Sequence, residues 1–196
     1  MGNPHGKPPR SDEAIAFAVV GQVLGISVEH ADAGSGDGMV DGLWTYPDGR
    51  RAALEVTAGE ASKEIGAEVR ARRRGETTHH SGSVNLNKLV ELLSKRLAEP
   101  WMEPNLNKLR AVNAAETHLY LWGRGKDDDF LYSTLADALP STPMALPAGL
   151  TDLWLDAYVF RGEGTLRNVT VVRYNIAQGW SIHRAVYDEA ILPMAN

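Results

Sequence analysis

The stretch from residue 40 to residue 57 constrains the fold of this chain more than any other. It reads Val-Asp-Gly-Leu-Trp-Thr-Tyr-Pro-Asp-Gly-Arg-Arg-Ala-Ala-Leu-Glu-Val-Thr, two runs rich in β-forming residues around Pro47-Asp48-Gly49. Proline presets the first turn angle, aspartate bonds to its own backbone, and glycine accepts a left-handed conformation. The pattern therefore predicts a β-hairpin with a three-residue loop, a type I turn closed by a bulge glycine.

The loop length decides which residues lie opposite one another. With Pro47-Asp48-Gly49 as the loop, Tyr46 pairs with Arg50, and counting back along both strands puts Asp41 opposite Glu55. Side chains directly across a ladder have β-carbons about 5 Å apart, so two like charges there repel unless a cation lies between them. A divalent cation with oxygen ligands is the simplest candidate. A two-residue loop remains an alternative, and it would turn Glu55 to the other face of the hairpin.

The first register also gives the hairpin a recognisable motif. Thr57 shares a face with Glu55 and Asp41, because strand side chains repeat every second residue. Asp41, a spacer of thirteen residues and then Glu55-Val56-Thr57 resemble the motif of the PD-(D/E)xK nuclease superfamily, which has the restriction-endonuclease-like fold. The resemblance covers residues 11–57 with a following helix and strand. It departs from the family pattern at Thr57, which stands where the family has lysine.

The resemblance implies a metal-dependent nuclease that hydrolyses the phosphodiester bonds of nucleic acid, with DNA as the expected substrate. It implies that Asp41 and Glu55, together with the Val56 carbonyl, hold Mg²⁺ or Mn²⁺. A glutamate on the helix before the sheet often joins the site in this family, and Glu13 has that position. A homodimer and a bacterial source are further expectations of the resemblance.

The missing lysine leaves the activity open. Thr57 and Lys63 complete the candidate catalytic set, with Lys63 as the nearest cation that could replace the lysine. A catalytically inactive member of the fold, binding nucleic acid or a protein, is the first alternative. The second is an interaction protein, such as an immunity or regulatory partner, in which the hairpin acids are incidental.

Apolar spacing predicts helices and strands on both sides of the hairpin. A helix over 11–24 has Ser11 as its N-cap and ends at Gly25. Further strands are expected at 26–30, 118–122 and 153–160, further helices at 86–98, 106–114 and 127–139, and a closing hairpin from 166–174 and 179–185. The predicted fold is α/β, a restriction-endonuclease-like core (α-β-β-β-α-β) with a mixed central sheet and a C-terminal β-hairpin addition. Residues 1–10 are expected to be a flexible tail before a single domain over 11–196.

Composition limits the partners and the metal chemistry. The net charge of −5 argues mildly against a chain coated in nucleic acid. The basic cluster at 70–74 is either a phosphate contact or a solvated helix face. The absence of cysteine excludes disulfides and thiolate metal sites, and it fits a cytoplasmic location. No apolar run approaches the length of about eighteen residues that a membrane helix requires, so no membrane partner is expected.

Overall fold

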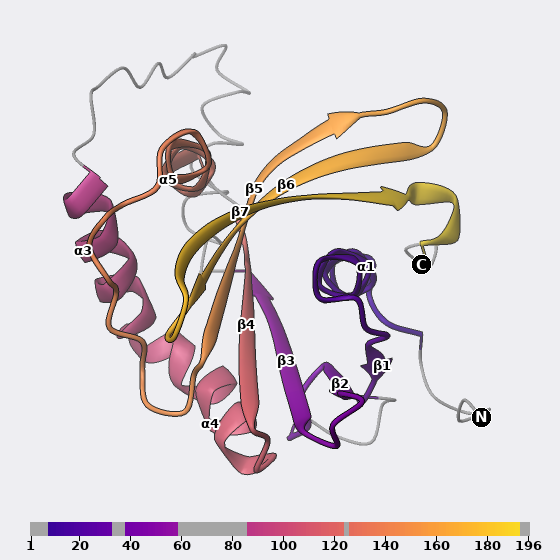
Figure 1. Ribbon diagram of the computed structural model, residues 1–196, viewed down its shortest axis with the longest axis horizontal. Helices are drawn as coiled ribbons and strands as arrows, with labels where there is room; N and C mark the ends of the chain where they lie inside the picture. The colour runs from indigo at the N-terminus through magenta and orange to yellow at the C-terminus, as the bar shows by residue number, and fades with distance from the viewer. Residues whose placement is uncertain (1–7, 33–37, 59–85, 124–125, 193–196) are drawn as a thin grey trace, which may run out of the picture.

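A seven-stranded mixed sheet with helices on both faces forms the body of the protein (Figure 1). The computed structural model describes residues 8–32, 38–58, 86–123 and 126–192. The strands lie in the sheet in the order of the sequence, from β1 to β7. The pairs β3–β4 and β4–β5 are parallel, and the other four pairs are antiparallel. The chain is therefore an α/β protein with a mixed sheet, as the sequence predicts.

Helices and strands alternate along the chain. The strands are β1 (Glu29–His30), β2 (Gly42–Thr45), β3 (Arg51–Ala58), β4 (Glu116–Trp122), β5 (Asp152–Arg161), β6 (Leu166–Asn175) and β7 (Gly179–Asp188). The helices are α1 (Ser11–Leu24), α3 (Leu86–Leu97), α4 (Glu103–Ala111) and α5 (Lys126–Asp137), with 3₁₀ turns at Pro100–Met102 and Glu189–Ile191. The predicted closing hairpin is confirmed as β6 and β7.

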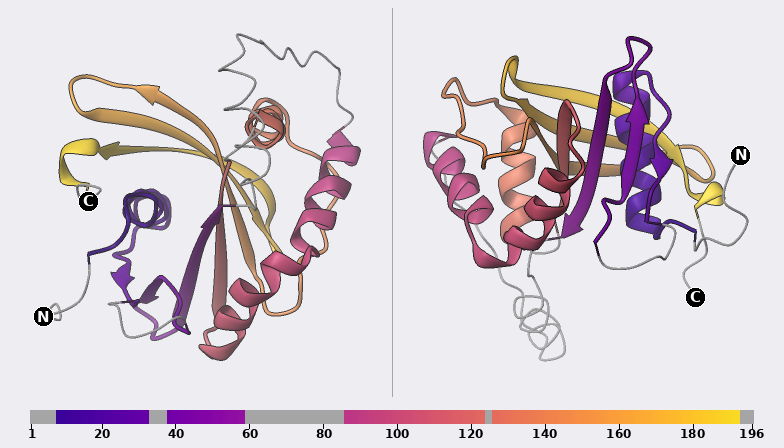
Figure 2. Two further views of the ribbon diagram at one scale, coloured as in Figure 1. Left: turned by 180° about the vertical axis from the view of Figure 1, so that it is seen from behind. Right: turned by 90° about the horizontal axis from the view of Figure 1, so that it is seen from below.

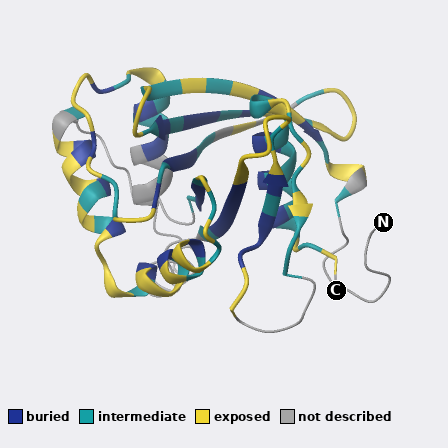
Figure 3. Ribbon diagram, turned by 60° about the horizontal axis from the view of Figure 1, so that its bottom comes forward, coloured by how far each residue is buried: buried dark blue, intermediate teal, exposed yellow. Residues whose placement is uncertain are grey.

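Two apolar cores cover the two faces of the sheet. One lies between the sheet and helices α3, α4 and α5, and the other lies between the sheet and α1. Helix α1 sits in the curve of the sheet, where it contacts β3 and β7 (Figures 1 and 2). On β4, Leu119 and Leu121 face the first core and Tyr120 faces the second. This strand is buried on both faces, as its continuous apolar sequence predicts, and Figure 3 shows the buried centre of the sheet.

The turn of the β2–β3 hairpin has the predicted three-residue form. The Tyr46 N–H donates to the Arg50 carbonyl over 2.8 Å, and the Gly49 N–H donates to the Tyr46 carbonyl over 2.9 Å. Gly49 has a φ of 85°, the left-handed conformation that a side chain would strain. Proline and aspartate thus precede a bulge glycine, as the sequence indicates.

This turn sets the register of the two strands. Gly42 pairs with Leu54, so the next position back places Asp41 opposite Glu55. The predicted register is confirmed, and the two-residue loop is excluded. The hairpin therefore carries both acids at its open end, away from the turn.

Some predicted boundaries are wrong. Ser11 is the first residue of α1 and Arg10 is its N-cap, because the Glu13 carboxylate accepts the Arg10 N–H over 2.8 Å. The expected strand over 26–30 is only the two-residue β1. The expected helix over 106–114 begins earlier, with Pro104 in its first turn, where a missing N–H costs nothing. None of the helices in the described ranges is long and apolar enough to cross a membrane.

Candidate functional site

Close packing of α1 against β2 brings the start of the helix to the hairpin acids. A Cβ on Gly42 would lie 2.6 Å from Val28 Cγ1 and 3.0 Å from Phe17 Cε1, so only glycine allows this approach. Phe17 lies one helical turn after Glu13. Glu13 Oε2 lies 3.8 Å from His30 Nε2, and His30 pairs with Gly42, the neighbour of Asp41, so the start of the helix lies near the hairpin acids. The charge of Glu13 also contributes to the raised pKa of Asp41, after burial.

The hairpin acids are almost completely buried. Asp41 is 4% exposed and Glu55 is 2% exposed. Asp41 Oδ2 accepts the Val56 N–H over 2.7 Å. The N–H and C=O of one strand residue point to the same edge, so the Val56 carbonyl is directed to the edge where Asp41 lies. Two carboxylates and one carbonyl thus meet at the open end of the hairpin.

A lysine from α4 completes this group. Lys108 Nζ lies 2.7 Å from Glu55 Oε1. One helical turn earlier, Asn105 Nδ2 lies 3.4 Å from Thr57 Oγ1. Residues three apart on a helix share a face, and residues two apart on a strand do the same. Asn105 and Lys108 of α4 can therefore contact Thr57 and Glu55 of β3 at the same time. Lys108 is the cation at this site that sequence reasoning missed.

The pair of acids is poorly neutralised. Burial raises the pKa of Asp41 to about 6, and the charge of Glu13 adds to the effect, while the Val56 N–H and Lys108 oppose it. Burial, and then the charge of Asp41, raise the pKa of Glu55 to about 7, although Lys108 opposes them. One ammonium group therefore does not offset the cost of two ionised carboxylates in this environment.

One oxygen of the pair has room for a further partner. Glu55 Oε2 is buried and has no hydrogen-bond partner among the residues that the structure describes. Buried carboxylate oxygens are normally satisfied, so such an oxygen calls for a cation or water. Carboxylates and a backbone carbonyl are the donors that Mg²⁺ and Mn²⁺ prefer. Asp41, Glu55 and the Val56 carbonyl therefore fit a hard divalent cation.

Glu13 lies beside this group, but protein donors already occupy it. Arg10 Nε lies 2.6 Å from Glu13 Oε1, and the Arg10 N–H donates to Oε2 over 2.8 Å. His30 Nε2 lies 3.8 Å from Oε2. Both oxygens of Glu13 thus contact Arg10 at the start of the same helix, so neither is free to bind a metal ion without losing such a contact.

The other predicted cations cannot be placed. Lys63, the expected replacement for the missing lysine, lies outside the described residues, as does the basic cluster at 70–74. Thr57 is in place on β3 beside Glu55, where the motif predicts it. The position of Lys108 gives the site a lysine that does not depend on Lys63.

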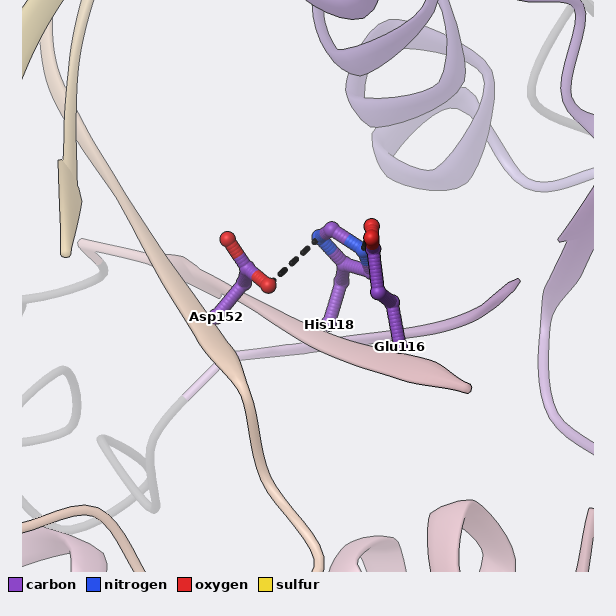
Figure 4. A group of neighbouring side chains, drawn as sticks. All are labelled: Glu116, His118 and Asp152. Carbon is purple, nitrogen blue, oxygen red and sulfur yellow. Dashed lines mark ion pairs between the residues drawn. The ribbon is translucent and has the colours of Figure 1, made fainter. Parts of the chain in front are cut away.

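A second cluster lies on the opposite face of the sheet, at the starts of β4 and β5 (Figure 4). Glu116, His118 and Asp152 offer ligand atoms within 4.8 Å of one another, so by proximity they could hold a metal ion. The sequence reasoning did not select any of them. Their hydrogen bonds decide how available they are.

Asp152 is fully engaged by its neighbours. Its Oδ1 accepts from Arg173 Nε over 2.8 Å and from Asn175 Nδ2 over 2.9 Å, and Arg173 Nη2 lies 2.6 Å away. Its Oδ2 accepts from the Thr151 hydroxyl over 2.8 Å. A cation here would have to displace an arginine that is itself mostly buried.

Glu116 is also strongly neutralised. It accepts the Tyr46 hydroxyl over 2.7 Å and pairs with Arg50. The neighbouring His118 ring and these donors lower the pKa of Glu116 to about 2. This carboxylate therefore stays ionised without any metal ion.

His118 separates the two carboxylates. Trp154 Nε1, which can only donate, lies 3.1 Å from His118 Nδ1, so Nδ1 is the acceptor and the neutral ring carries its proton on Nε2. Nε2 faces Glu116 Oε2 at 3.5 Å, and Nδ1 faces Asp152 Oδ2 at 3.7 Å. The two carboxylates thus lie on either side of the ring (Figure 4), and both are already engaged by protein donors. The cluster is best explained as a buried network that ties β4 to its neighbours.

Comparison of the chain with known proteins does not assign a role to either group of residues. No family model matches the chain, no curated protein matches it, and no solved structure matches it.

Proposed function

We propose that this chain is a metal-dependent nuclease that hydrolyses phosphodiester bonds of nucleic acid, with DNA as the expected substrate. The observation that carries the proposal is the group at the open end of the hairpin. Asp41 and Glu55 are opposite one another and buried, and Lys108 Nζ lies 2.7 Å from Glu55. Two acids and a lysine in one place match the chemistry of the PD-(D/E)xK motif, even though Thr57 replaces its lysine.

The order of the elements supports the same family. Helix α1 is followed by the antiparallel strands β1, β2 and β3, by further helices, and by β4 parallel to β3. This order agrees with the α-β-β-β-α-β core of the restriction-endonuclease-like fold that the sequence predicts. The pair β6–β7 extends the sheet beyond that core.

The residues of the site have separate roles in this proposal. Asp41, Glu55 and the Val56 carbonyl would hold Mg²⁺ or Mn²⁺, which lowers the pKa of a bound water and offsets charge on the phosphate. Lys108 orients the attacking water and stabilises the negative charge that develops, the work of the motif lysine. Thr57, held near Asn105, offers a hydroxyl on the same face.

One observation favours a silent, nucleic-acid-binding member as the second candidate. Asp41 accepts the Val56 N–H and Glu55 accepts from Lys108, so each acid already has a partner from the protein itself. Such a group can persist in a protein that no longer cleaves. The homodimer and the cytoplasmic location remain predictions under either function.

Metal binding and cleavage together test the proposal. Titration calorimetry with Mn²⁺ should show binding to the wild type and almost none to Asp41→Ala or Glu55→Ala. Asp48→Ala is the matched control, because Asp48 is an exposed acid in the same hairpin, and it should bind Mn²⁺ like the wild type. Labelled DNA duplex, single-stranded DNA and RNA should then be incubated with each protein and Mn²⁺.

The outcomes separate the candidates. Cleavage that both acid variants lose supports the nuclease. Metal binding without cleavage of any substrate favours the silent member. Unchanged metal binding in both acid variants, or none in the wild type, would contradict a metal site at the hairpin.

A further inference from the structure

Arg10 is the N-cap of α1 and pairs with Glu13 in the first turn of that helix. Its side chain is 64% exposed, and its Nε lies 2.6 Å from Glu13 Oε1 and 3.5 Å from Asp12 Oδ1. Burial opposes the charge of Arg10, but the carboxylates of Asp12, Glu13 and Asp41 outweigh it and raise the pKa of the guanidinium. Glu13, which Arg10 contacts, lies 3.8 Å from His30, and His30 pairs with Gly42 next to Asp41, so this cation lies near the hairpin acids.

The contacts of Arg10 with neighbouring carboxylates are made through Nε, on one side of the guanidinium. They hold Nε on Glu13 at 2.6 Å and on Asp12 at 3.5 Å, and the side chain is 64% exposed. A guanidinium fixed at Nε presents its other two nitrogens as a planar pair of donors. That pair suits two oxygens of one phosphate group.

The same contacts keep a second metal ion away from Glu13. Both of its oxygens already accept from Arg10, one from the side chain and one from the backbone. A second cation would have to displace a charged, anchored side chain. The buried Glu55 Oε2, which has no hydrogen-bond partner among the described residues, offers a separate place for the proposed metal ion.

We infer that Arg10 binds a phosphate group of the nucleic acid and supplies, in place of a second metal ion, the second positive charge of the site. The inference rests on the proposed function. Lys108 on α4 and Arg10 at the start of α1 then flank the acid pair from two elements. The arginine would hold the phosphate beside the acid pair and Lys108, where Asp41 and Glu55 would hold one metal ion.

Binding without metal isolates this contact. The Kd of a fluorescein-labelled DNA duplex of about sixteen base pairs should be measured by anisotropy in chelator over a range of KCl concentrations. Arg10→Ala should weaken binding about tenfold and reduce the slope of log Kd against log salt by about 0.9, the value for one phosphate contact. Arg10→Lys keeps the charge, so it should keep the slope but lose about threefold in affinity. It also tests the contact if Arg10→Ala fails to fold.

Arg50→Ala is the matched control. Arg50 is also anchored on carboxylates and half exposed, but it lies at the turn, at the other end of the hairpin. Its removal should leave both Kd and slope unchanged. Calorimetry on the wild type should give one Mn²⁺ per chain.

Each result has a definite meaning. A wild type that binds and cleaves DNA, with an unchanged Kd and slope in Arg10→Ala, overturns the inference alone. Two Mn²⁺ per chain in the wild type would overturn it as well. A wild type that neither binds nor cleaves nucleic acid overturns the proposed function, and the inference with it.

Discussion

Two groups of carboxylates lie on opposite faces of the sheet, and they are neutralised to very different degrees. In the network at the starts of β4 and β5, the pKa of Glu116 falls to about 2 because its imidazole, hydroxyl and guanidinium neighbours favour the ionised form. At the open end of the hairpin, the pKa of Glu55 rises to about 7 because burial and Asp41 disfavour that form. The environment of the first group therefore stabilises an ionised carboxylate, and that of the second group destabilises one.

This difference separates a structural cluster from a candidate site. Asp152 receives donors from β6 and Glu116 receives one from the β2–β3 turn, so these charges tie neighbouring parts of the sheet together. Asp41 and Glu55 have one side-chain cation in direct contact, Lys108 on Glu55, and an unpartnered oxygen. A divalent cation would offset the poorly neutralised charge of the second group, whereas the carboxylates of the first group already pair with arginines. The distances between ligand atoms, taken alone, would favour the first group as the metal site.

The largest expected effect is on cleavage. If the protein is a nuclease, Lys108→Met should reduce cleavage about 100- to 1000-fold, the lower part of the range for a positioned proton-transfer group. Mn²⁺ binding should persist, because Lys108 is not a ligand. Gel assays with Mn²⁺ and labelled DNA measure the first quantity, and calorimetry measures the second.

Lys88→Met is the control for that change. The pentapeptide around Lys108, Asn-Leu-Asn-Lys-Leu, occurs a second time around Lys88. Lys88 is exposed on α3. Its removal should leave cleavage unchanged. Thr57→Lys in the Lys108→Met background should restore part of the activity, since it puts a cation back at the motif position. Equal cleavage by Lys108→Met and the wild type would remove Lys108 from the mechanism.

The next largest effect is on the stability of the other group. Asp152→Asn should lower the free energy of unfolding by about 3 kcal/mol, because it leaves the mostly buried Arg173 without its counter-charge. Urea denaturation measures this loss. Asp48→Asn, in an exposed pair with Arg50, should leave the free energy of unfolding nearly unchanged, because solvent screens that pair.

Metal addition sharpens the same comparison. Mn²⁺ or Zn²⁺ should not raise the Tm of Asp41→Ala, although that variant keeps Glu116, His118 and Asp152 intact. A clear rise in that variant would show that the network binds metal after all.

The sequence predicts the hairpin site well because a local turn determines it. Pro47-Asp48-Gly49 fixes the loop, the loop fixes the register, and the register places Asp41 opposite Glu55. The lysine is different, because it comes from α4, more than fifty residues later. The same pentapeptide occurs at 85–89 and 105–109, so no pattern in the chain distinguishes Lys88 from Lys108.

The network on the other face could not be predicted in this way. Its members meet because β4 pairs with β5 in parallel, with His118 opposite Asp152. A parallel pair has no tight turn from which the register can be counted. The apolar residues of β4 predict the strand itself. They do not indicate which side chains lie beside the buried His118. Tertiary pairing, rather than local sequence, creates this group.

A smaller effect should appear in the pH dependence of the metal-free protein. The folded pKa of Glu55, about 7, lies above its ordinary value, so Glu55 favours folding below about pH 4.5 and progressively less as the pH rises to 7. Relative to the wild type, Glu55→Gln should therefore gain about 1 to 2 kcal/mol of stability between pH 5 and pH 8. Urea melts in chelator at the two pH values measure the change. A constant difference between the two proteins would mean that Lys108 neutralises Glu55 completely.

The smallest effect has the opposite sign and belongs to Glu116. Its folded pKa, about 2, lies below its ordinary value, so its stabilising contribution is present above about pH 4.5 and is lost as the pH falls toward 2. Glu116→Gln should cost about 1 kcal/mol at pH 7, a modest value because the side chain is 23% exposed and solvent screens its contacts. The cost should shrink steadily in melts between pH 4.5 and pH 2.5, while the effect of Glu55→Gln changes mainly above pH 4.5. If both variants followed the same pH dependence, the two groups of acids would not differ in their neutralisation, and the physical distinction between network and site would fail.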